Sequence, residues 1–148
     1  MSVNYVEVIP DPSRVIEGLR DTGYSPETAI EDIIDNSISA GASKIKVNLR
    51  MDLSGEVSVS IIDNGCGMNE EELKNAMKYG SRLRPDPASL GKFGLGMKTA
   101  STAFARKLVV VSRGESSKDY MKAYWDLDHV VKEKKWELAL EEPSNEEI

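Results

Sequence analysis

A change of hydrophobic period near residue 42 constrains the fold of this chain more than any other feature. Between residues 26 and 40 the apolar side chains recur at the spacing of one helix face. In "KIKVNLRMD" (44–52) apolar and polar residues instead alternate, as they do in a half-buried strand. A Ser-Gly pair then favours a turn into a second strand at 56–63. A helix followed by a hairpin predicts a domain in which helices pack on a sheet.

The remaining sequence continues this mixture of helices and strands. Ser25 before a proline favours the start of the 26–40 helix, and Asn69 with Glu72 predicts a capping box at a later helix that ends at Gly80. Further helices are expected at 11–21 and 95–107, and strands at 5–9, 108–114, 120–128 and 136–141. The stretch 81–94 has no period and predicts a long loop, which in compact domains usually serves function or is disordered. The expected class is α+β: a two-layer sandwich of a mixed or antiparallel sheet with helices on one face.

Composition excludes several classes of protein. The formal net charge of -6 argues against general binding to nucleic acid or to an anionic membrane. With one cysteine, Cys66, the chain has no intrachain disulfide and no cysteine metal cluster, and one histidine disfavours a Ser-His-Asp triad. The start "MSVNYVEVIPDPS" lacks the features of a signal peptide, and no apolar run reaches the roughly 18 residues of a membrane span. We therefore expect a cytoplasmic protein.

The motif "IIDNGCGM" (61–68) ends the second hairpin strand with a carboxylate. Asp63 shares the strand parity of the inward apolar residues, so its side chain needs a hydrogen-bond donor. Gly65 and Gly67 remove side-chain bulk, so a flat ligand can lie against this backbone while Met68 packs on its ring. The alternative is a tight strand-to-helix turn in which Asp63 is a local acceptor.

The motif "GKFGLGMKTAS" (91–101) opens a helix with three glycines. Backbone N–H groups at such a helix start, together with the helix dipole, form an anion site, and Lys98 adds a cation for a terminal phosphate. The spacing matches neither a Walker A loop nor a Rossmann fingerprint. The alternative is a flexible loop followed by an ordinary helix.

The helix at 26–40 carries a third candidate. Asp32 and Asn36 are four residues apart and therefore lie on one face. A carboxamide oxygen suits Mg²⁺, and a carboxylate one turn earlier can orient or deprotonate a water that attacks a phosphate. The alternative is a solvated acidic helix face.

These three motifs, in this order, resemble the GHKL superfamily of ATPases, which includes DNA gyrase B, Hsp90, sensor histidine kinases and MutL. The resemblance covers residues of about 25 to 128, implies the Bergerat ATP-binding fold, and is nearest to the MORC-like, Hsp90-like branch. It implies Asn36 as the Mg²⁺ ligand, Asp63 as the acceptor from adenine, and a mobile lid at about 81–93. The ATP-binding residues it implies are Asp35, Asn36, Asp63, Gly65, Gly67, Met68, Ser81, Gly91, Lys92, Phe93, Gly94, Leu95, Gly96, Met97, Lys98 and Thr99.

The sequence departs from the family pattern in two places. Where hydrolytic members have a glutamate base, this chain has Asp32, whose side chain is shorter by about 1.3–1.5 Å. Misplacement of that size costs roughly 10²-fold in rate, so slow hydrolysis is expected. A late strand with Gly-Thr is also missing, and the fold is expected to lack its last strand. The missing strand would expose an edge of the sheet, which a homodimer or residues 136–141 would cover.

The resemblance defines the expected organisation and its alternatives. We expect an ATP-binding domain over 1–142 and an acidic, disordered tail over 143–148. ATP is expected to drive a conformational or dimerisation switch, with a homodimer formed through the N-terminal segment or the lid and a transducer domain downstream. One alternative is a non-catalytic, ATP-gated binding module. A histidine-kinase catalytic domain fits less well, because no phosphoacceptor helix precedes the motifs.

Overall fold

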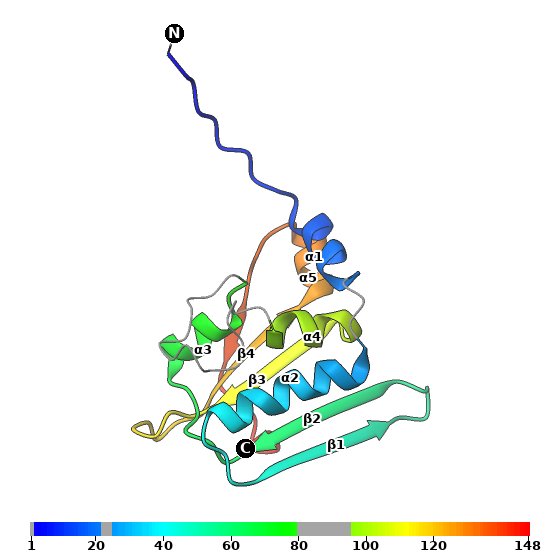
Figure 1. Cartoon of the computed structure of the whole chain (residues 1–148), viewed down its shortest axis with the longest axis vertical. Helices are drawn as coiled ribbons and strands as arrows, with labels where there is room; N and C mark the ends of the chain where they lie inside the picture. The colour runs from blue at the N-terminus through cyan, green and yellow to red at the C-terminus, as the bar shows by residue number, and fades with distance from the viewer. Residues whose placement is uncertain (1, 22–24, 80–95) are drawn as a thin grey trace.

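The computed structural model describes residues 2–21, 25–79 and 96–148, and these ranges form an α+β fold of helices and antiparallel sheets (Figure 1). The predicted class is confirmed. The elements in chain order are α1 (Pro12–Arg20), α2 (Pro26–Ser39), β1 (Ile45–Met51), β2 (Val57–Asp63), α3 (Glu70–Met77), α4 (Gly96–Phe104), β3 (Lys107–Ser112), β4 (Met121–Asp126), α5 (Leu127–Glu133) and β5 (Ala139–Glu141).

Side-chain caps fix where the helices begin. The Ser25 hydroxyl accepts from the N–H of Thr28 at the start of α2, as the sequence predicts. At α3 the capping box is complete: Asn69 accepts from the Glu72 N–H, and Glu72 accepts from the Asn69 N–H. The predicted end of this helix at Gly80 lies outside the described residues, and α3 itself ends at Met77.

The β1–β2 hairpin pairs Ile45 with Asp63 at its base and Met51 with Val57 at its tip. The alternating apolar residues of both strands share one face, as predicted, whereas Ile62 pairs with Lys46 on the other face. α2 packs on the base of this face, whereas near the tip the side chains of Leu49, Met51 and Val57 remain exposed. The hairpin therefore extends beyond the helix layer.

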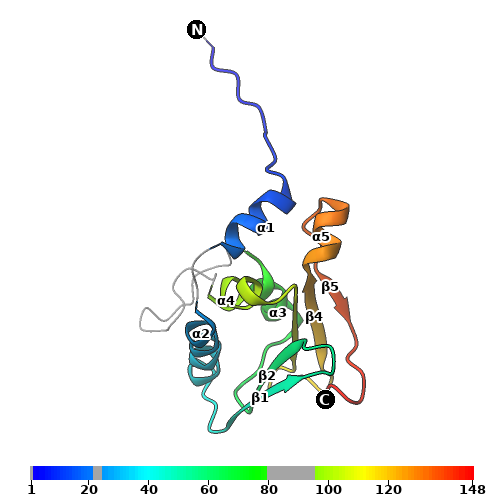
Figure 2. The same cartoon turned by 90° about the vertical axis from the view of Figure 1, so that its right-hand side faces the viewer.

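The second sheet has the antiparallel order β3-β4-β5. α4 packs on β3 and α3 on β4, and Figure 2 shows α2 and α4 on the same side of the strands. The indole Nε1 of the buried Trp125 donates to the carbonyl of Met77 at 2.7 Å, which joins β4 to the end of α3. The core between these layers consists of Ile16, Leu73, Met77, Ala123, Trp125, Leu127 and Val130.

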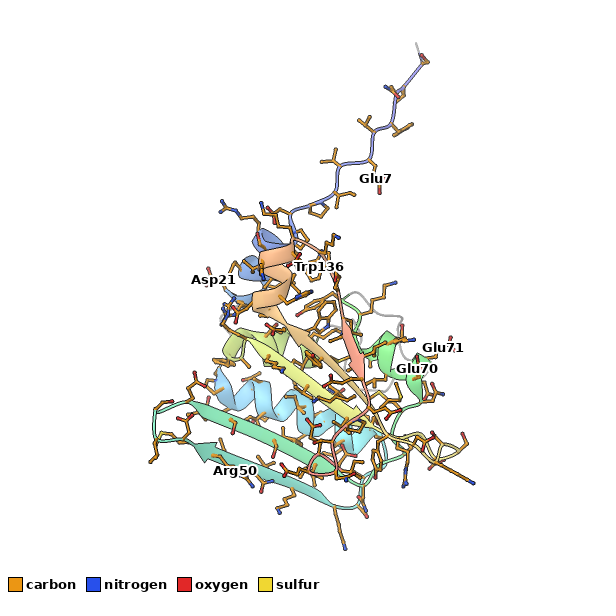
Figure 3. All side chains as sticks on the ribbon, turned by 180° about the vertical axis from the view of Figure 1, so that it is seen from behind. Glu7, Asp21, Arg50, Glu70, Glu71 and Trp136 are labelled. Carbon is orange, nitrogen blue, oxygen red and sulfur yellow. The ribbon has the colours of Figure 1, made fainter. Side chains whose placement is uncertain are left out.

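Two predicted strands are wrong in detail. Residues 5–9 form no strand: residues 2–10 lie in an extended arm that leaves the body of the molecule, on which Glu7 is labelled (Figure 3). An isolated extended segment has no partner for its backbone N–H and C=O groups, so alternation alone does not make a strand. The predicted strand 120–128 stops at Asp126, whose carboxylate accepts from the N–H groups of Asp128 and His129 and so starts α5.

The strands of the described ranges also form two hydrogen-bonded sheets rather than the single expected sheet. The loop after β2 joins them instead, because the N–H of Met68 donates to the Ser112 hydroxyl at the end of β3 (2.9 Å). The C-terminal residues 143–148 are described as well. Glu147 pairs there with Lys122 of β4 (2.7 Å).

Candidate functional site

The junction of α2 and β2 presents a carboxylate held by two donors. Asp63 is the last residue of β2, and its Oδ2 accepts from the hydroxyl of Ser37 on α2 at 2.7 Å. Its Oδ1 accepts from the N–H of Gly65 at 2.9 Å. Ser37 is buried, whereas the side chain of Asp63 is exposed. The carboxylate therefore has a fixed plane and keeps acceptor capacity on its open side.

The two glycines after Asp63 allow the chain to approach its neighbours closely. A Cβ on Gly65 would lie 2.8 Å from the Cβ of Ala40, and the next N–H, of Cys66, donates to the Ala40 carbonyl (2.9 Å). Gly67 has φ +66°, and a Cβ there would lie 2.0 Å from the carbonyl oxygen of Arg113. Both positions thus require glycine for packing within the protein, a reason that the sequence did not provide.

Asn64 is a structural residue that the sequence analysis missed. Its Oδ1 accepts from the N–H groups of Ser43 (2.9 Å) and Lys44 (2.8 Å), and its Nδ2 donates to the Ser43 hydroxyl. These bonds tie the segment after α2 to the segment after β2. An asparagine directly after a strand is a common turn signal, and this signal could have predicted the structural role of Asn64.

The acidic face of α2 borders this junction. Asp32, Asp35 and Asn36 are half-buried, and α2 lies alongside α4 (Figure 1). The predicted helix places Asp32 and Asn36 one turn apart, as expected. In the described ranges no group of three or more His, Cys, Asp or Glu side chains gathers as a metal site. The oxygen donors of α2 fit Mg²⁺ that is shared with phosphates, because such a site needs only one or two protein ligands.

The predicted phosphate-binding residues are described only in part. Ser81 and the run Gly91–Leu95 lie outside the described residues. Gly96, Met97 and Thr99 belong to the first turn of α4. Lys98 is buried, and its Nζ donates to the carbonyl of Ala76 near the end of α3 at 2.7 Å. Met68 is half-buried and packs against the hydrophobic core.

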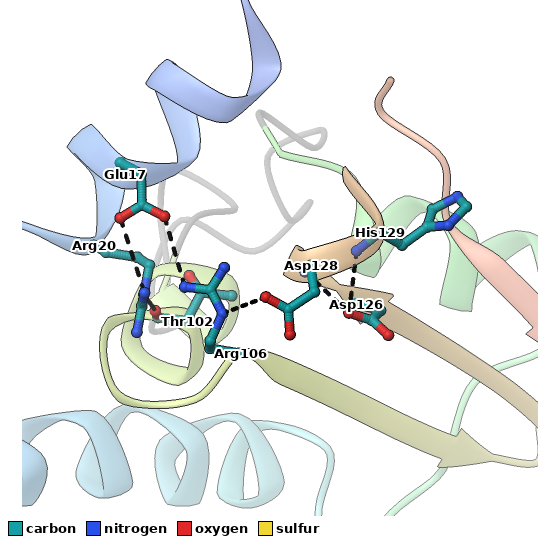
Figure 4. A network of polar contacts seen from close by, with 7 residues as sticks. All are labelled: Glu17, Arg20, Thr102, Arg106, Asp126, Asp128 and His129. Atoms are coloured by element: carbon teal, nitrogen blue, oxygen red, sulfur yellow. Dashed lines mark hydrogen bonds and ion pairs between the residues drawn. The ribbon is translucent and has the colours of Figure 1, made fainter. Parts of the chain in front are cut away.

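A polar network holds α1 against α4 and α5 (Figure 4). The Arg20 guanidinium donates to the carbonyl of Thr102 in α4 at 2.9 Å. Arg106 bonds Asp128 of α5 at 2.7 Å and lies 3.6 Å from Glu17 of α1. These carboxylates raise the pKa of Arg106 above its usual value, the hydrogen bond to Asp128 most of all. The network fixes the helix that follows the exposed arm.

Comparison with known proteins identifies the class. A profile of the family described as "Histidine kinase-, DNA gyrase B-, and HSP90-like ATPase" matches residues 24–148, so the chain belongs to this family. The predicted resemblance is confirmed, and family membership supports ATP binding. In the described part of the chain, no helix is both long and apolar enough to span a bilayer.

Individual relatives support the MORC-like branch. ATPase MORC2B of Mus musculus is 27% identical over 93 residues, which are 60% of this chain and 9% of that protein. ATPase morc-1 of Caenorhabditis elegans is 27% identical over 92 residues, 62% of this chain and 11% of that protein. The DNA mismatch repair protein MutL of Phenylobacterium zucineum is 31% identical over 70 residues, 47% of this chain and 11% of that protein. The aligned parts cover only about a tenth of these relatives.

Proposed function

We propose that this chain binds Mg-ATP at the α2–β2 junction and hydrolyses it slowly to drive a conformational or dimerisation switch. The observation that carries the proposal is the Asp63 carboxylate, fixed by Ser37 and Gly65 and open on one side. A fixed acceptor of this kind suits the amino group of adenine, in agreement with the family to which the chain belongs. We assign this recognition to Asp63.

Asn36 and Asp32 act at the phosphate end of the bound nucleotide. The Asn36 carboxamide oxygen holds Mg²⁺, which neutralises charge on the phosphates when it is bound. Asp32, one turn earlier on α2, accepts the proton of the attacking water. The N–H groups in the first turn of α4 bind phosphate oxygens. Lys98 is assigned to the same role from the sequence alone, since in the structure its buried Nζ donates to the Ala76 carbonyl. The lid at 81–93 and the predicted ATP-binding residues that lie outside the described ranges are assigned from the sequence alone.

Two variants test binding separately from turnover. Titration calorimetry with ATP and Mg²⁺ is expected to show binding, and Asp63→Asn is expected to weaken it roughly 10-fold or more. Asn36→Ala is expected to weaken binding with Mg²⁺ present but to have little effect in EDTA, because its ligand is the metal. If the wild-type chain binds neither ATP nor ADP, the proposal is wrong.

A third variant tests the assignment of Asp32. Glutamate restores the missing methylene, so Asp32→Glu is expected to raise the rate of phosphate release by roughly 10- to 100-fold. Asp32→Asn should abolish release while ATP still binds. The matched control is Asp21→Glu, the same change at an exposed residue after α1. Equal release from wild type and Asp32→Asn would remove the base role.

The shorter Asp32 in place of the family's glutamate also favours a second function, a non-catalytic ATP-gated binding module. In that case ATP changes partner contacts or dimerisation without being consumed. ATP binding without phosphate release, even in Asp32→Glu, would select this function. The exposed arm offers Val3, Tyr5, Val6, Val8 and Ile9 as the dimerisation segment, which sedimentation with and without ATP tests. A downstream transducer domain and a cytoplasmic location remain parts of the proposal.

A further inference from the structure

The side chain of Ser37 ends in a buried hydroxyl that bonds the carboxylate of Asp63. Only 4% of the residue is exposed, and its Oγ lies 2.7 Å from Oδ2 of Asp63. Ser37 occupies the same side of α2 as Ile33 and Ile34, where an apolar residue would pack at least as well. A hydroxyl buried there needs a partner, and an ionised carboxylate is its strongest acceptor.

The two donors act on different oxygens of the same carboxylate. Ser37 bonds Oδ2 and the Gly65 N–H bonds Oδ1, so rotation of the Asp63 side chain would break at least one bond. Both bonds use the carboxylate as an acceptor and hold its remaining acceptor positions in one orientation. A ligand that offers an N–H is therefore favoured, whereas a ligand that offers a carbonyl oxygen meets a second acceptor.

We infer that Ser37 is a positioning residue that sets base selectivity by holding Asp63 as an oriented acceptor for an exocyclic amino group. The inference rests on the proposed function. Ser37 follows Asn36 directly on α2, so one helix supports both base selection and the metal. Without the hydroxyl, Asp63 keeps the bond from the Gly65 N–H on Oδ1 but loses the bond on Oδ2, so its carboxylate rotates more freely. It then discriminates less between a base with an amino group at position 6 and a base without one.

The test compares two nucleotides that differ at the atom Asp63 contacts. Dissociation constants for ATP and for purine riboside triphosphate, which has hydrogen in place of the 6-amino group, are measured on the full chain by calorimetry with Mg²⁺. We expect Ser37→Ala to weaken ATP roughly 10-fold and to change purine riboside triphosphate less than about 3-fold. Ser39→Ala, the same change at an exposed position of α2, should alter neither.

A double-mutant cycle separates positioning from simple damage to the fold. In an Asp63→Asn background, Ser37→Ala should have no further effect on the ratio of the two dissociation constants. Ser37→Cys keeps the size of the side chain with a weaker donor and should give an intermediate ratio, with circular dichroism as the check on folding. An equal loss for both nucleotides, or an unchanged ratio, overturns the inference while ATP binding stands. A wild-type chain that binds neither nucleotide overturns the proposed function itself.

Discussion

Gly67 is the residue whose identity the structure constrains most. Its φ of +66° is unfavourable for other residues, and a Cβ would lie 2.0 Å from the Arg113 carbonyl oxygen. The contact joins the loop after β2 to the end of β3, which no ladder connects in the described ranges. Because Gly67 has no side chain, the loop after β2 can approach the end of β3 this closely.

Gly67→Ala is expected to lower the free energy of unfolding by about 2–5 kcal/mol, the sum of the left-handed backbone cost and the overlap. Urea denaturation followed by circular dichroism measures it. The matched control is Gly41→Ala, since Gly41 has φ +75° with open space around its Cβ position. Only the backbone cost of about 1–2 kcal/mol applies there. Equal losses in the two variants would contradict the described contact.

Among single residues, the sequence predicts the position of those that follow helix or strand spacing. It does not predict the role of a residue that depends on a partner distant in the sequence. Strand parity predicted that the Asp63 carboxylate needs a donor, which Ser37 and Gly65 supply. Helical spacing predicted that Asp32 and Asn36 lie one turn apart on α2, and the roles of these residues stay predictions. Ser37 was missed because a small polar residue on an apolar helix face looks neutral until its partner is known. Its partner is 26 residues away in sequence, and only the packing of α2 on β2 brings the two together.

Among the elements, α3 depends on its first turn. It has eight residues, begins with the capping box of Asn69 and Glu72, and ends where Trp125 bonds its last carbonyl. Short helices gain little from propensity, so the cap and the packing of Leu73 and Met77 must hold it.

Asn69→Ala is expected to lower the free energy of unfolding by about 1 kcal/mol, because the Glu72 N–H loses its side-chain acceptor. Glu72→Ala should cost less, and the double variant should cost less than the sum of the two. Chemical denaturation gives all three values. Glu71→Ala, an exposed acidic neighbour in the same turn, is the control. Strict additivity of Asn69→Ala and Glu72→Ala would show that the two side chains do not act as a capping box.

Element prediction succeeded where local signals suffice. The hairpin, α2 and the start of α3 follow from alternation, helical spacing and caps. The strand expected at 5–9 failed because strand formation depends on a partner elsewhere in the chain. α5 was missed because the carboxylate of Asp126 both ends β4 and caps the following turn.

On the scale of the whole molecule, the C-terminal end is tied back to the sheet. Lys122 of β4 pairs with Glu141 of β5 at 2.8 Å and with Glu147 at 2.7 Å. The hydrogen bond to Lys122 is the largest cause that lowers the pKa of Glu147, to about 2 from the usual 4.5. Two carboxylates on one ammonium group thus connect β4, β5 and the tail.

The lowered pKa predicts how stability depends on pH. Between pH 4.5 and about 2 the unfolded chain binds a proton at Glu147 that the folded chain does not bind. The contribution of Glu147 is therefore complete above pH 4.5 and is lost as the pH falls toward 2. Unfolding curves of wild type and Glu147→Gln should differ at pH 6 and converge near pH 2. The difference should shrink in high salt, because the pair is partly exposed.

Glu146→Gln, at the exposed neighbouring residue, is the control for net charge. If it reproduces the pH dependence of Glu147→Gln, the effect belongs to overall charge and not to the contact with Lys122. The sequence could not supply this contact, since an acidic stretch at a chain end predicts only a solvated tail. Register between β4 and β5 places Lys122 opposite Glu141, and that pairing is a property of the folded sheet.

The hairpin that extends beyond α2 also makes the molecule a practical scaffold. Its tip, residues 52–56, and Asp63 lie at opposite ends of the seven-residue strand β2, about 20 Å apart along the extended chain. Side chains at the tip are exposed, and Leu53 contacts solvent on all sides. A reporter domain inserted there leaves the base of the hairpin and the Ser37–Asp63 contact in place.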